Sequence, residues 1–351
     1  MRIVLAYSGS LEGSAAIQWL RAHHGAEVVA VTLDLGQGRE LEAVRDRALS
    51  VGAQRAHVLD ARDAFAHGYV LPALRADALH DGSVPMARAL SRPLIAEKLV
   101  EIAGIERAGA VAHTGSAADG VSPLDRLLAS LAPELPVLTP ARNWDLTAET
   151  LAAFARSHGF SGAEDAARPD ANFWGRSVRV QDGSPSSRVA AAPQAPSPSE
   201  PAFVDIAFSR GVPTALNGVP LPLVELVTAL GTLTAAHGVG RGQAGTLWCD
   251  APAAVLLHAA HRELTRATSS DELAAFSADA TARYVRLVED AGWFSPLRAG
   301  LDAYFSSVQA HVNGHVRLRV FGGGHSTITT EHSGPASSPT SLRRVPSSAQ
   351  H

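Results

Sequence analysis

Lysine and cysteine are almost absent from this chain of 351 residues: Lys98 is its one lysine and Cys249 its one cysteine. A single lysine excludes a phosphate-loop lysine, because none follows a glycine-rich turn, and it removes most Schiff-base chemistry. A single cysteine excludes an internal disulfide and a cysteine-rich metal site, and it is typical of a small buried apolar residue. The chemistry of this protein must therefore use other groups.

Long hydrophobic runs and an excess of positive charge are also missing. No apolar run reaches the roughly 18 residues that a membrane-spanning helix needs. With 30 Lys and Arg against 34 Asp and Glu, the net charge is −4, and no basic stripe offers the phosphate neutralisation that nucleic-acid binding requires. We therefore expect neither a membrane nor a nucleic-acid partner. Because a strand pattern begins at Arg2 without a leader-like apolar run, we expect a cytoplasmic protein.

Short apolar runs alternate with helical patterns in the first half of the chain. The runs lie at 2–6, 27–33, 56–59, 110–113 and 136–139, and the longest helical pattern covers 90–102. This alternation predicts an α/β fold with a parallel sheet, in which the loops after the strands share one crevice. The loops at 7–14, 34–38 and 113–120 are thus the expected ligand site.

A change of composition divides the chain. Residues 181–200 are rich in Ser, Pro, Ala and Gly, which predicts a mobile linker. Beyond it, strand patterns flank Ser209-Arg210-Gly211, Asn217-Gly218 signals a second turn, and four helical patterns precede a strand at 315–321. We expect a nucleotide-binding domain at 1–165, a connecting segment and linker at 166–200, an α+β domain at 201–322 and a disordered tail at 323–351.

One loop offers groups for binding phosphate. The run Ser8-Gly9-Ser10-Leu11-Glu12-Gly13-Ser14 follows the first strand and opens a helix, so it presents hydroxyls and backbone N–H groups at the positive end of a helix dipole. The same pattern also fits a helix-capping turn without a ligand. The fifteen histidines lack the spacing of a metal site, so we expect no metal bound by protein ligands alone.

A set of collinear motifs resembles the argininosuccinate synthase family. Tyr7-Ser8-Gly9-x-Leu11 with Ser14 and Trp19-Leu20 is similar to that family's pyrophosphate loop, whose pattern is AYSGGLDTS. Further segments agree in order and spacing, namely Asp34-Leu35-Gly36-Gln37-Gly38, Arg92-Pro93-Leu94-Ile95-Ala96, Trp174-Gly175-Arg176-Ser177, His237-Gly238-Val239-Gly240-Arg241, Ala251-Pro252-Ala253-Ala254 and Trp293-Phe294-Ser295-Pro296-Leu297-Arg298. The resemblance covers residues 1 to about 321.

The resemblance implies an N-type ATP pyrophosphatase domain, of the adenine nucleotide alpha hydrolase-like kind, followed by a second domain. It implies a ligase of arginine biosynthesis that joins citrulline to aspartate, with ATP and Mg²⁺, and releases AMP and pyrophosphate. The nucleotide-binding residues would be Ala6, Tyr7, Ser8, Gly9, Ser10, Leu11, Glu12, Gly13 and Ser14. The substrate-binding residues would be Ser116 and Ser177, while no single catalytic residue is indicated.

The substrate segments depart from the family. In the loop, Ser10, Glu12 and Gly13 replace Gly, Asp and Thr. The aspartate-binding pattern TGKGNDQVRFE falls on 116–126, where Gly, Val and Leu replace Asn, Asp and Arg. The pattern YxLGTSLARP falls on 84–93, which lacks its tyrosine and its serine. We therefore expect weak or lost turnover of citrulline and aspartate. The Ser/Pro-rich end replaces the family's tetramer-forming arm, which leaves a homo-oligomer possible.

Two other functions stay open from the sequence. The protein is either a repurposed adenylating ligase acting on another ureido or carboxylate substrate, or a catalytically silent paralogue that serves as a binding or regulatory partner. Arg88, Asp119, Asp125 and Arg126 are candidates for rebuilding a pocket, although charged residues on a loop are also typical of a solvated surface.

Overall fold

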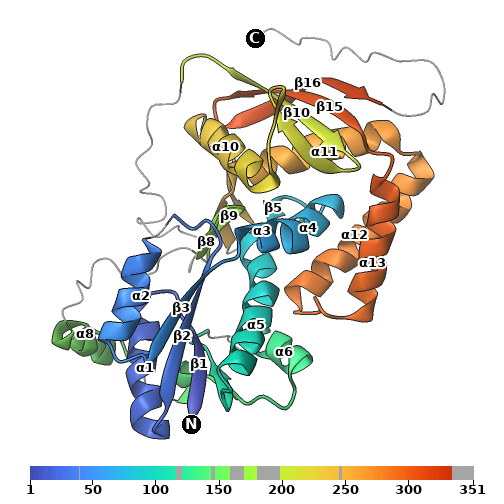
Figure 1. The fold of residues 1–351 in the computed structure, drawn as a ribbon. Coiled ribbons are helices and arrows are strands. Elements are labelled where there is room, and N and C mark those ends of the chain that lie inside the picture. Colours follow the sequence, from blue (N-terminus) through green and yellow to red (C-terminus); the bar gives the residue numbers. More distant parts are fainter. Residues whose placement is uncertain are drawn as a thin grey trace. The chain divides into compact units, whose positions relative to one another are not determined.

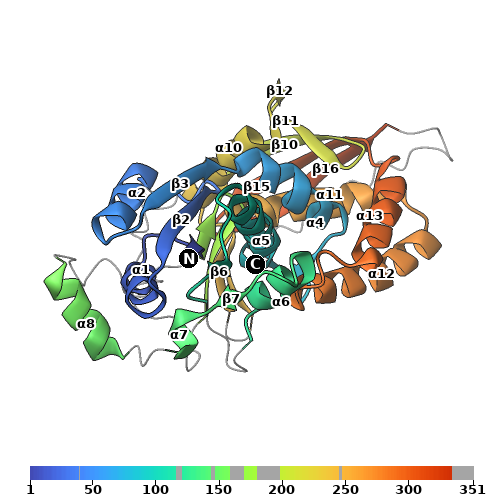
Figure 2. The ribbon, with the colours of Figure 1, turned by 60° about the horizontal axis from the view of Figure 1, so that its bottom comes forward.

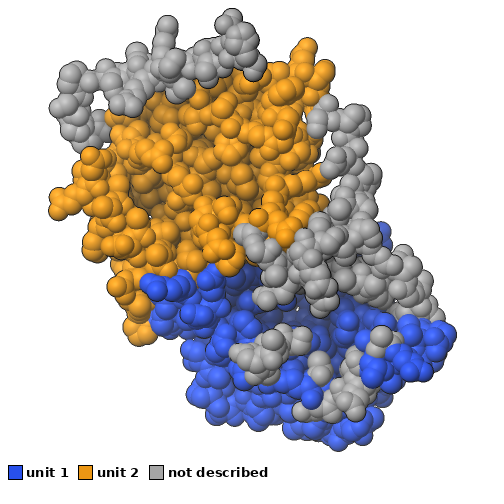
Figure 3. All heavy atoms as spheres, turned by 180° about the vertical axis from the view of Figure 1, so that it is seen from behind, with its two compact units in different colours: residues 1–65, 88–172, 286–295 blue, residues 66–87, 173–285, 296–351 orange. Residues whose placement is uncertain are grey.

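The computed structural model describes residues 1–38, 40–115, 121–143, 147–158, 170–179, 198–244 and 247–333. The chain divides into two compact units, coloured separately in Figure 3. Unit 1 contains residues 1–65, 88–172 and 286–295, and unit 2 contains residues 66–87, 173–285 and 296–351. Each unit is therefore built from separate stretches of the chain. The sequential boundaries expected near residues 165 and 201 stay a prediction.

Unit 1 is built on a parallel sheet of five strands in the order β3-β2-β1-β6-β7, of which Figure 1 labels β1, β2 and β3. The strands are β1 (Arg2–Ala6), β2 (Glu27–Asp34), β3 (Arg55–Asp60), β6 (Ala110–Ala112) and β7 (Val137–Leu138). All five strands predicted from the sequence are present, and the predicted α/β class is confirmed.

Helices cover both faces of this sheet. Ile3, Val4 and Leu5 of β1 are fully buried in succession, as expected for a strand covered on both sides. Figure 2 shows α1 (Leu11–His24) and α2 (Leu41–Ser50) on one side of the strands and α5 (Ala87–Ile105) on the other. The remaining elements of unit 1 are α3 (Arg62–Phe65), α6 (Pro123–Leu131), α7 (Pro140–Asn143), α8 (Ala148–Ser157) and β8 (Asp170–Asn172).

Unit 2 contains an antiparallel sheet in the order β12-β11-β10-β15-β16. Its strands are β10 (Ala202–Ser209), β11 (Val212–Leu216), β12 (Val219–Pro220), β15 (Gly314–Phe321) and β16 (Gly324–His332). Along β15, buried Val316, Leu318 and Val320 alternate with exposed residues. Helices α10 (Leu223–Ala236) and α11 (Pro252–Thr268) contact this sheet. The predicted second α+β domain is therefore confirmed.

Three two-residue turns organise this sheet. Arg210-Gly211, Asn217-Gly218 and Gly322-Gly323 each have positive φ at both residues, as the tight turns of β-hairpins require. The third turn corrects an expectation. Residues 324–332, expected to be disordered because they are polar and rich in Ser and Thr, form β16 because this hairpin pairs them with β15. Residues 334–351 lie outside the described part.

Of the remaining elements, α4 (Leu71–Arg75), β5 (Val84–Pro85) and β9 (Gly175–Arg179) contact α11. The others are a π-helical turn (Ala66–Val70), β4 (Leu79–His80), β13 (Arg241–Ala244), β14 (Leu247–Asp250), α13 (Pro296–Gln309) and α12 (Asp271–Glu289), whose last residues belong to unit 1. Most of the expected linker, 180–197, lies outside the described residues. Within the described part, no helix is both long and apolar enough to cross a membrane.

A buried carboxylate at the amino-terminal edge of the unit 1 sheet holds three strand residues. The carboxylate of Glu106, 3% exposed, accepts hydrogen bonds from Arg55 Nη1 at 2.9 Å, His57 Nε2 at 2.9 Å and Arg2 Nη1 at 3.2 Å. The hydrogen bond from His57, with those from Arg55, holds the pKa of Glu106 below its ordinary value. Glu106 therefore contributes stability that is present at neutral pH and is lost as the pH falls through its titration range.

Glu106→Gln should lower the free energy of unfolding at pH 7 by about 1.5–3 kcal/mol, because hydrogen bonds to a charged group contribute about that much. The matched control is Glu101→Gln on α5, whose partner Lys98 Nζ lies 2.6 Å away in an exposed pair and contributes about 0–1 kcal/mol. Urea unfolding at a series of pH values from 7 downward measures both. Equal losses in the two variants at pH 7, or a Glu106 loss that does not diminish at any lower pH, would contradict this role for Glu106.

Candidate active site

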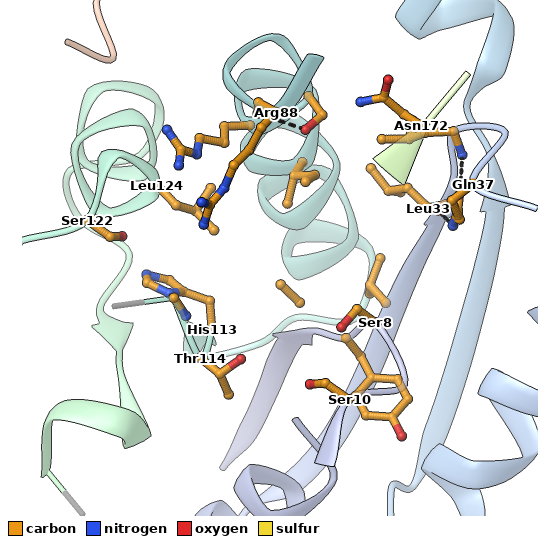
Figure 4. Close-up of a pocket in the computed structure, with 18 of the residues that line it drawn as sticks. Ser8, Ser10, Leu33, Gln37, Arg88, His113, Thr114, Ser122, Leu124 and Asn172 are labelled. Atoms are coloured by element: carbon orange, nitrogen blue, oxygen red, sulfur yellow. Dashed lines mark hydrogen bonds between the residues drawn. The ribbon is translucent and has the colours of Figure 1, made fainter. Parts of the chain in front are cut away.

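A pocket of about 470 Å³ opens at the carboxyl edge of the unit 1 sheet (Figure 4). β1 is the central strand, paired with β2 on one side and β6 on the other. The connections therefore leave in opposite directions, which creates a crevice where open α/β sheets bind ligands. The pocket is lined from the loop after β1, the end of β2, the first turns of α5, the residues after β6, the start of α6, and β8. The three expected loops do share one crevice.

The loop after β1 is shaped by Gly9. Its φ of +78° is a conformation that glycine adopts without strain. A Cβ at this position would also lie 3.0 Å from Val44 Cγ2 of α2. The carbonyl oxygen of Gly9 accepts a hydrogen bond from Arg47 Nη1 at 2.8 Å. Helix α2 thus fixes the loop from outside the pocket.

Ser10 links this loop to the first helix. It is the N-cap of α1, and its Oγ accepts a hydrogen bond from the Gly13 N–H at 3.1 Å. Because this bond uses only the oxygen, the hydroxyl hydrogen can be donated to a group in the pocket, which Ser10 lines. A Cβ at Gly13 would lie 3.1 Å from both Ser10 Oγ and Tyr7 Cδ2. The hydroxyl at position 10 therefore fits best where position 13 has no side chain.

Ser14 is part of the support of the loop. Its Oγ donates to the Ser10 carbonyl at 2.9 Å and lies 2.8 Å from the hydroxyl of Tyr7, both side chains being buried. Since Ser14 uses its hydrogen on Ser10, the Tyr7 hydroxyl donates to Ser14. This chain joins the end of β1 to the first turn of α1.

On another side of the pocket, the lining residue His113 is hydrogen-bonded to Asp125, which does not itself line the pocket. His113, 1% exposed and just after β6, accepts a hydrogen bond at Nδ1 from the Gly115 N–H at 3.0 Å. Its Nε2 lies 3.0 Å from Asp125 Oδ1 and therefore donates to it. Burial lowers the pKa of His113, so its ring is neutral with the hydrogen on Nε2. Asp125 also accepts from Arg142 Nη2 at 2.7 Å and completes the capping box of α6 with Ser122.

The described residues that line the pocket include more positively charged than negatively charged side chains. Arg88 and Arg92 line it from α5, whereas Glu12 is the one carboxylate among its described lining residues. Three helices, α1, α5 and α6, begin at this pocket, and a helix N-terminus favours anions. No group of three or more His, Cys, Asp or Glu side chains within the described residues could hold a metal ion. The electrostatics of the pocket suit an anionic ligand.

The structure places the residues expected for nucleotide binding in two groups. Those that line the pocket are Ala6, Tyr7, Ser8, Gly9, Ser10 and Glu12. Leu11, Gly13 and Ser14 do not line it, because they belong to the first turn of α1 and to its supporting bonds. Ser116 lies outside the described residues. Ser177 belongs to β9 of unit 2, where its side chain is 3% exposed.

The four residues considered for rebuilding a pocket differ in where the structure places them. Arg88 lines the pocket, Asp125 is bound to His113 and the α6 cap, Arg126 is exposed, and Asp119 lies outside the described residues. No functional role was expected for His113 itself, although it ends the predicted strand 110–113 and begins the loop 113–120 that was expected at the ligand site. Cys249 is buried, which raises the pKa of its thiol to about 11 and fits the expected structural role.

Two family models match consecutive parts of this chain. The model described as "Arginosuccinate synthase N-terminal HUP domain" matches residues 2–161, and "Arginosuccinate synthase C-terminal domain" matches residues 170–338. The chain belongs to the argininosuccinate synthase family. The N-terminal match covers every described strand of the parallel sheet and the whole loop after β1.

Curated argininosuccinate synthases match along nearly the whole chain. That of Rubrobacter xylanophilus is 40% identical over 343 residues, covering 92% of this chain and 83% of its own length. That of Geobacillus kaustophilus is 39% identical, and the match covers 92% of this chain and 84% of the relative. That of Oceanobacillus iheyensis is 37% identical, and the match covers 94% of this chain and 84% of the relative. Among solved structures, a predicted tRNA methyltransferase subunit from Methanocaldococcus jannaschii is 14% identical, with a TM-score of 0.30. The match covers 45% of this chain and 76% of that structure's chain, and this similarity is too low to support a conclusion.

Gly9→Ala should lower the free energy of unfolding by about 1–3 kcal/mol, because a side chain at positive φ is strained, and should weaken nucleotide binding by displacing the loop. Gly25→Ala, at the C-cap of α1, is the matched control: its φ is +56°, but a Cβ there meets nothing within 4 Å. Thermal unfolding and ATP titration of both variants separate the backbone strain from the Val44 contact. Equal losses of ATP affinity in the two variants would show that this contact does not shape the site.

Proposed function

We propose that this protein is an ATP-dependent carbon–nitrogen ligase with the chemistry of argininosuccinate synthases. The observation that supports it best is the pocket at the β1–β6 crevice, lined by the loop Ser8–Ser10, in a chain that both family models match. In this proposal ATP places its phosphates against the loop and the start of α1. ATP, the amino-acid substrates, a cytoplasmic location and a homo-oligomeric state are all parts of the proposal.

Catalysis in this pocket would depend on placement and electrostatics. An oxygen of the bound acceptor attacks the α-phosphorus of ATP, the bond to the β-phosphate breaks, and pyrophosphate leaves with the electron pair. An amine then attacks the activated carbon, loses a proton, and AMP leaves. Donors that meet the developing charge lower both barriers. We assign this task to the hydroxyls of Ser8 and Ser10, the guanidinium of Arg92 and the helix N-termini.

Mg²⁺ would enter this site with the nucleotide. It is usually bound by substrate phosphates, water and one or two carboxylates. Glu12, exposed in the first turn of α1, is the described carboxylate that lines the pocket, so it fits this limited role. Bound there, the ion would offset charge on the phosphates. Glu12 would orient it through water or directly.

Turnover of citrulline and aspartate is proposed to be weak. Leu124 lines the pocket where the family pattern has an arginine, and Val121 stands where it has an aspartate. A hydrogen bond to a charged group contributes about 1.5–3 kcal/mol, so losing about four of them costs about 6–12 kcal/mol of substrate or transition-state binding. That corresponds to about four to eight decades in rate or affinity.

A second candidate function keeps the chemistry but changes the acceptor. Arg88 supports it, because this cation lines the pocket at a position where the family pattern has a threonine. A silent paralogue would retain the fold without nucleotide binding. These functions differ in what the pocket binds, so one set of titrations distinguishes them.

Calorimetric titration with Mg·ATP, with and without citrulline and aspartate, followed by pyrophosphate release in the same samples, tests the proposal. We expect Mg·ATP to bind, and pyrophosphate release that needs an acceptor and is slow with citrulline and aspartate. Release at the rate of an ordinary biosynthetic enzyme, with kcat of about 10 s⁻¹, would contradict the weak turnover. Absence of Mg·ATP binding would overturn both ligase functions and leave the silent paralogue.

Ser177 is proposed as a substrate contact, and its environment makes that testable. Its buried hydroxyl has no hydrogen-bond partner among the described residues, so Ser177→Ala should leave the melting temperature unchanged or higher while raising KM for the acceptor by about tenfold or more. Ser14→Ala, which removes a buried hydroxyl with two bonds, is the contrast and should lower the melting temperature. An unchanged KM in Ser177→Ala would remove this residue from the substrate site.

A further inference from the structure

Asp125 joins two segments of the pocket lining without lining the pocket itself. Its Oδ2 accepts a hydrogen bond at 2.7 Å from the backbone N–H of Ser122, a lining residue at the start of α6. Its Oδ1 accepts one at 3.0 Å from Nε2 of His113, a lining residue after β6, and another at 2.7 Å from Arg142 Nη2. Figure 4 shows Ser122 and His113 on one side of the pocket. A single carboxylate therefore fixes both segments.

The bond to Asp125 sets the tautomer of His113. Because a carboxylate only accepts hydrogen bonds, Nε2 carries the ring hydrogen and Nδ1 keeps its lone pair. That lone pair accepts a hydrogen bond at 3.0 Å from the N–H of Gly115, which lines the pocket together with Thr114. With a hydrogen on Nδ1, two N–H groups would point at each other, and the backbone at Gly115 would have to move. The conformation of residues 113–115 thus depends on this tautomer.

The surroundings of His113 favour its neutral form. Burial of the ring, which is 1% exposed, is the largest effect and lowers its pKa. Asp125 on α6 raises the pKa and Arg142 on α7 lowers it, and the net result is a pKa below the ordinary value. The other charged side chains in the described lining of the pocket are Glu12, Arg88 and Arg92. The ring is therefore neutral at pH 7 and gains a proton only as the pH falls.

We propose that His113 and Asp125 are positioning residues for nucleotide binding: the carboxylate holds the ring in one tautomer, and the ring holds Thr114 and Gly115 in the conformation that binds Mg·ATP. Neither residue takes part in the chemistry. Asp125 stands where the family pattern TGKGNDQVRFE has a phenylalanine, so that pattern does not imply this pair. The inference rests on the proposed function, since it takes Mg·ATP to be the ligand of the pocket.

This arrangement makes nucleotide binding sensitive to acid. Protonation of His113 at Nδ1 replaces the acceptor of the Gly115 N–H with a donor and releases the segment. Because the binding conformation requires the neutral ring, the affinity for Mg·ATP is complete above the pKa of His113 and falls as the pH drops below it.

Asp125→Asn tests the carboxylate. An amide has one accepting oxygen, so the Ser122 N–H or the His113 Nε2–H must then face its NH₂ group. We expect the Mg·ATP affinity of the full-length protein, measured calorimetrically at pH 8, to fall about tenfold or more. The matched control is Glu106→Gln, because that carboxylate also accepts from a histidine and arginines but lies at the amino-terminal edge of the sheet. Its Mg·ATP affinity should equal that of the unaltered protein.

His113→Asn separates the positioning role from a merely structural one. Asparagine Oδ1 can take the place of Nδ1 and accept from the Gly115 N–H, but it does not titrate. The variant should keep the affinity at pH 8 to within about threefold. It should lack the fall of about tenfold per pH unit that we expect for the unaltered protein below the pKa of His113.

Mg·ATP titrations from pH 8 downward measure both profiles, and circular dichroism at each pH checks folding. The titration of Mg·ATP itself is common to both proteins and cancels in the comparison. The Asp125 and His113 variants test the proposal independently, so if one is unfolded the other decides.

The outcomes distinguish this inference from the proposed function. Mg·ATP affinity unchanged in Asp125→Asn, or lowered equally in Asp125→Asn and Glu106→Gln, would refute the positioning role and still support the nucleotide site. Coincident pH profiles of the unaltered protein and His113→Asn would do the same. Absence of Mg·ATP binding to the unaltered protein at every pH would refute the ligase, and the positioning role with it.

Discussion

The parallel pairing of β1 with strands on both of its sides is the constraint on which the site depends. Because β2 and β6 flank the same strand, the loops that follow all three strands end at one edge. The backbone hydrogen bonds of a buried central strand cannot be exchanged for water, so this edge is held rigidly. Gly9 and Ser10 then need only local interactions, with α2 and with the first turn of α1, to hold the loop that lines the pocket. The bonds that support the loop join it to α1 and α2 and leave Ser8 and Ser10 in the lining of the pocket.

The sequence predicted this frame well because its signals are local. Apolar runs of the right length gave the five strands, and the Asn217-Gly218 turn was found from its residues alone. The third hairpin was missed although Gly322-Gly323 carries the same kind of signal, because the strand that follows is rich in Ser and Thr and has few apolar residues. This strand, β16, forms because it pairs with β15, which is buried on one face, and because α11 contacts both strands.

The candidate site was harder to predict because its residues come together only in three dimensions. The glycine- and serine-rich loop could be recognised, but which of its residues face the pocket depends on where α1 begins. The hydroxyl of Ser14 resembles a ligand group in the sequence and turns out to be a structural support. His113 and Asp125 are twelve residues apart and separated by a segment outside the described residues, so no short motif joins them. Arg88 was a candidate from the sequence, but that it lines the pocket while Asp125 and Arg126 do not depends on how α5 and α6 face the pocket.

The contact between positions 10 and 13 restricts how this loop can change over evolutionary time. A hydroxyl on Ser10 and a side chain at position 13 compete for the same space, as the 3.1 Å approach of a Cβ at Gly13 indicates. The family pattern has glycine and threonine at these positions, and this chain has serine and glycine. A path of single substitutions between the two pairs therefore passes more easily through glycine at both positions than through serine with threonine. The packing of this one helical turn therefore restricts the order in which the two substitutions can occur, as well as which residues are allowed.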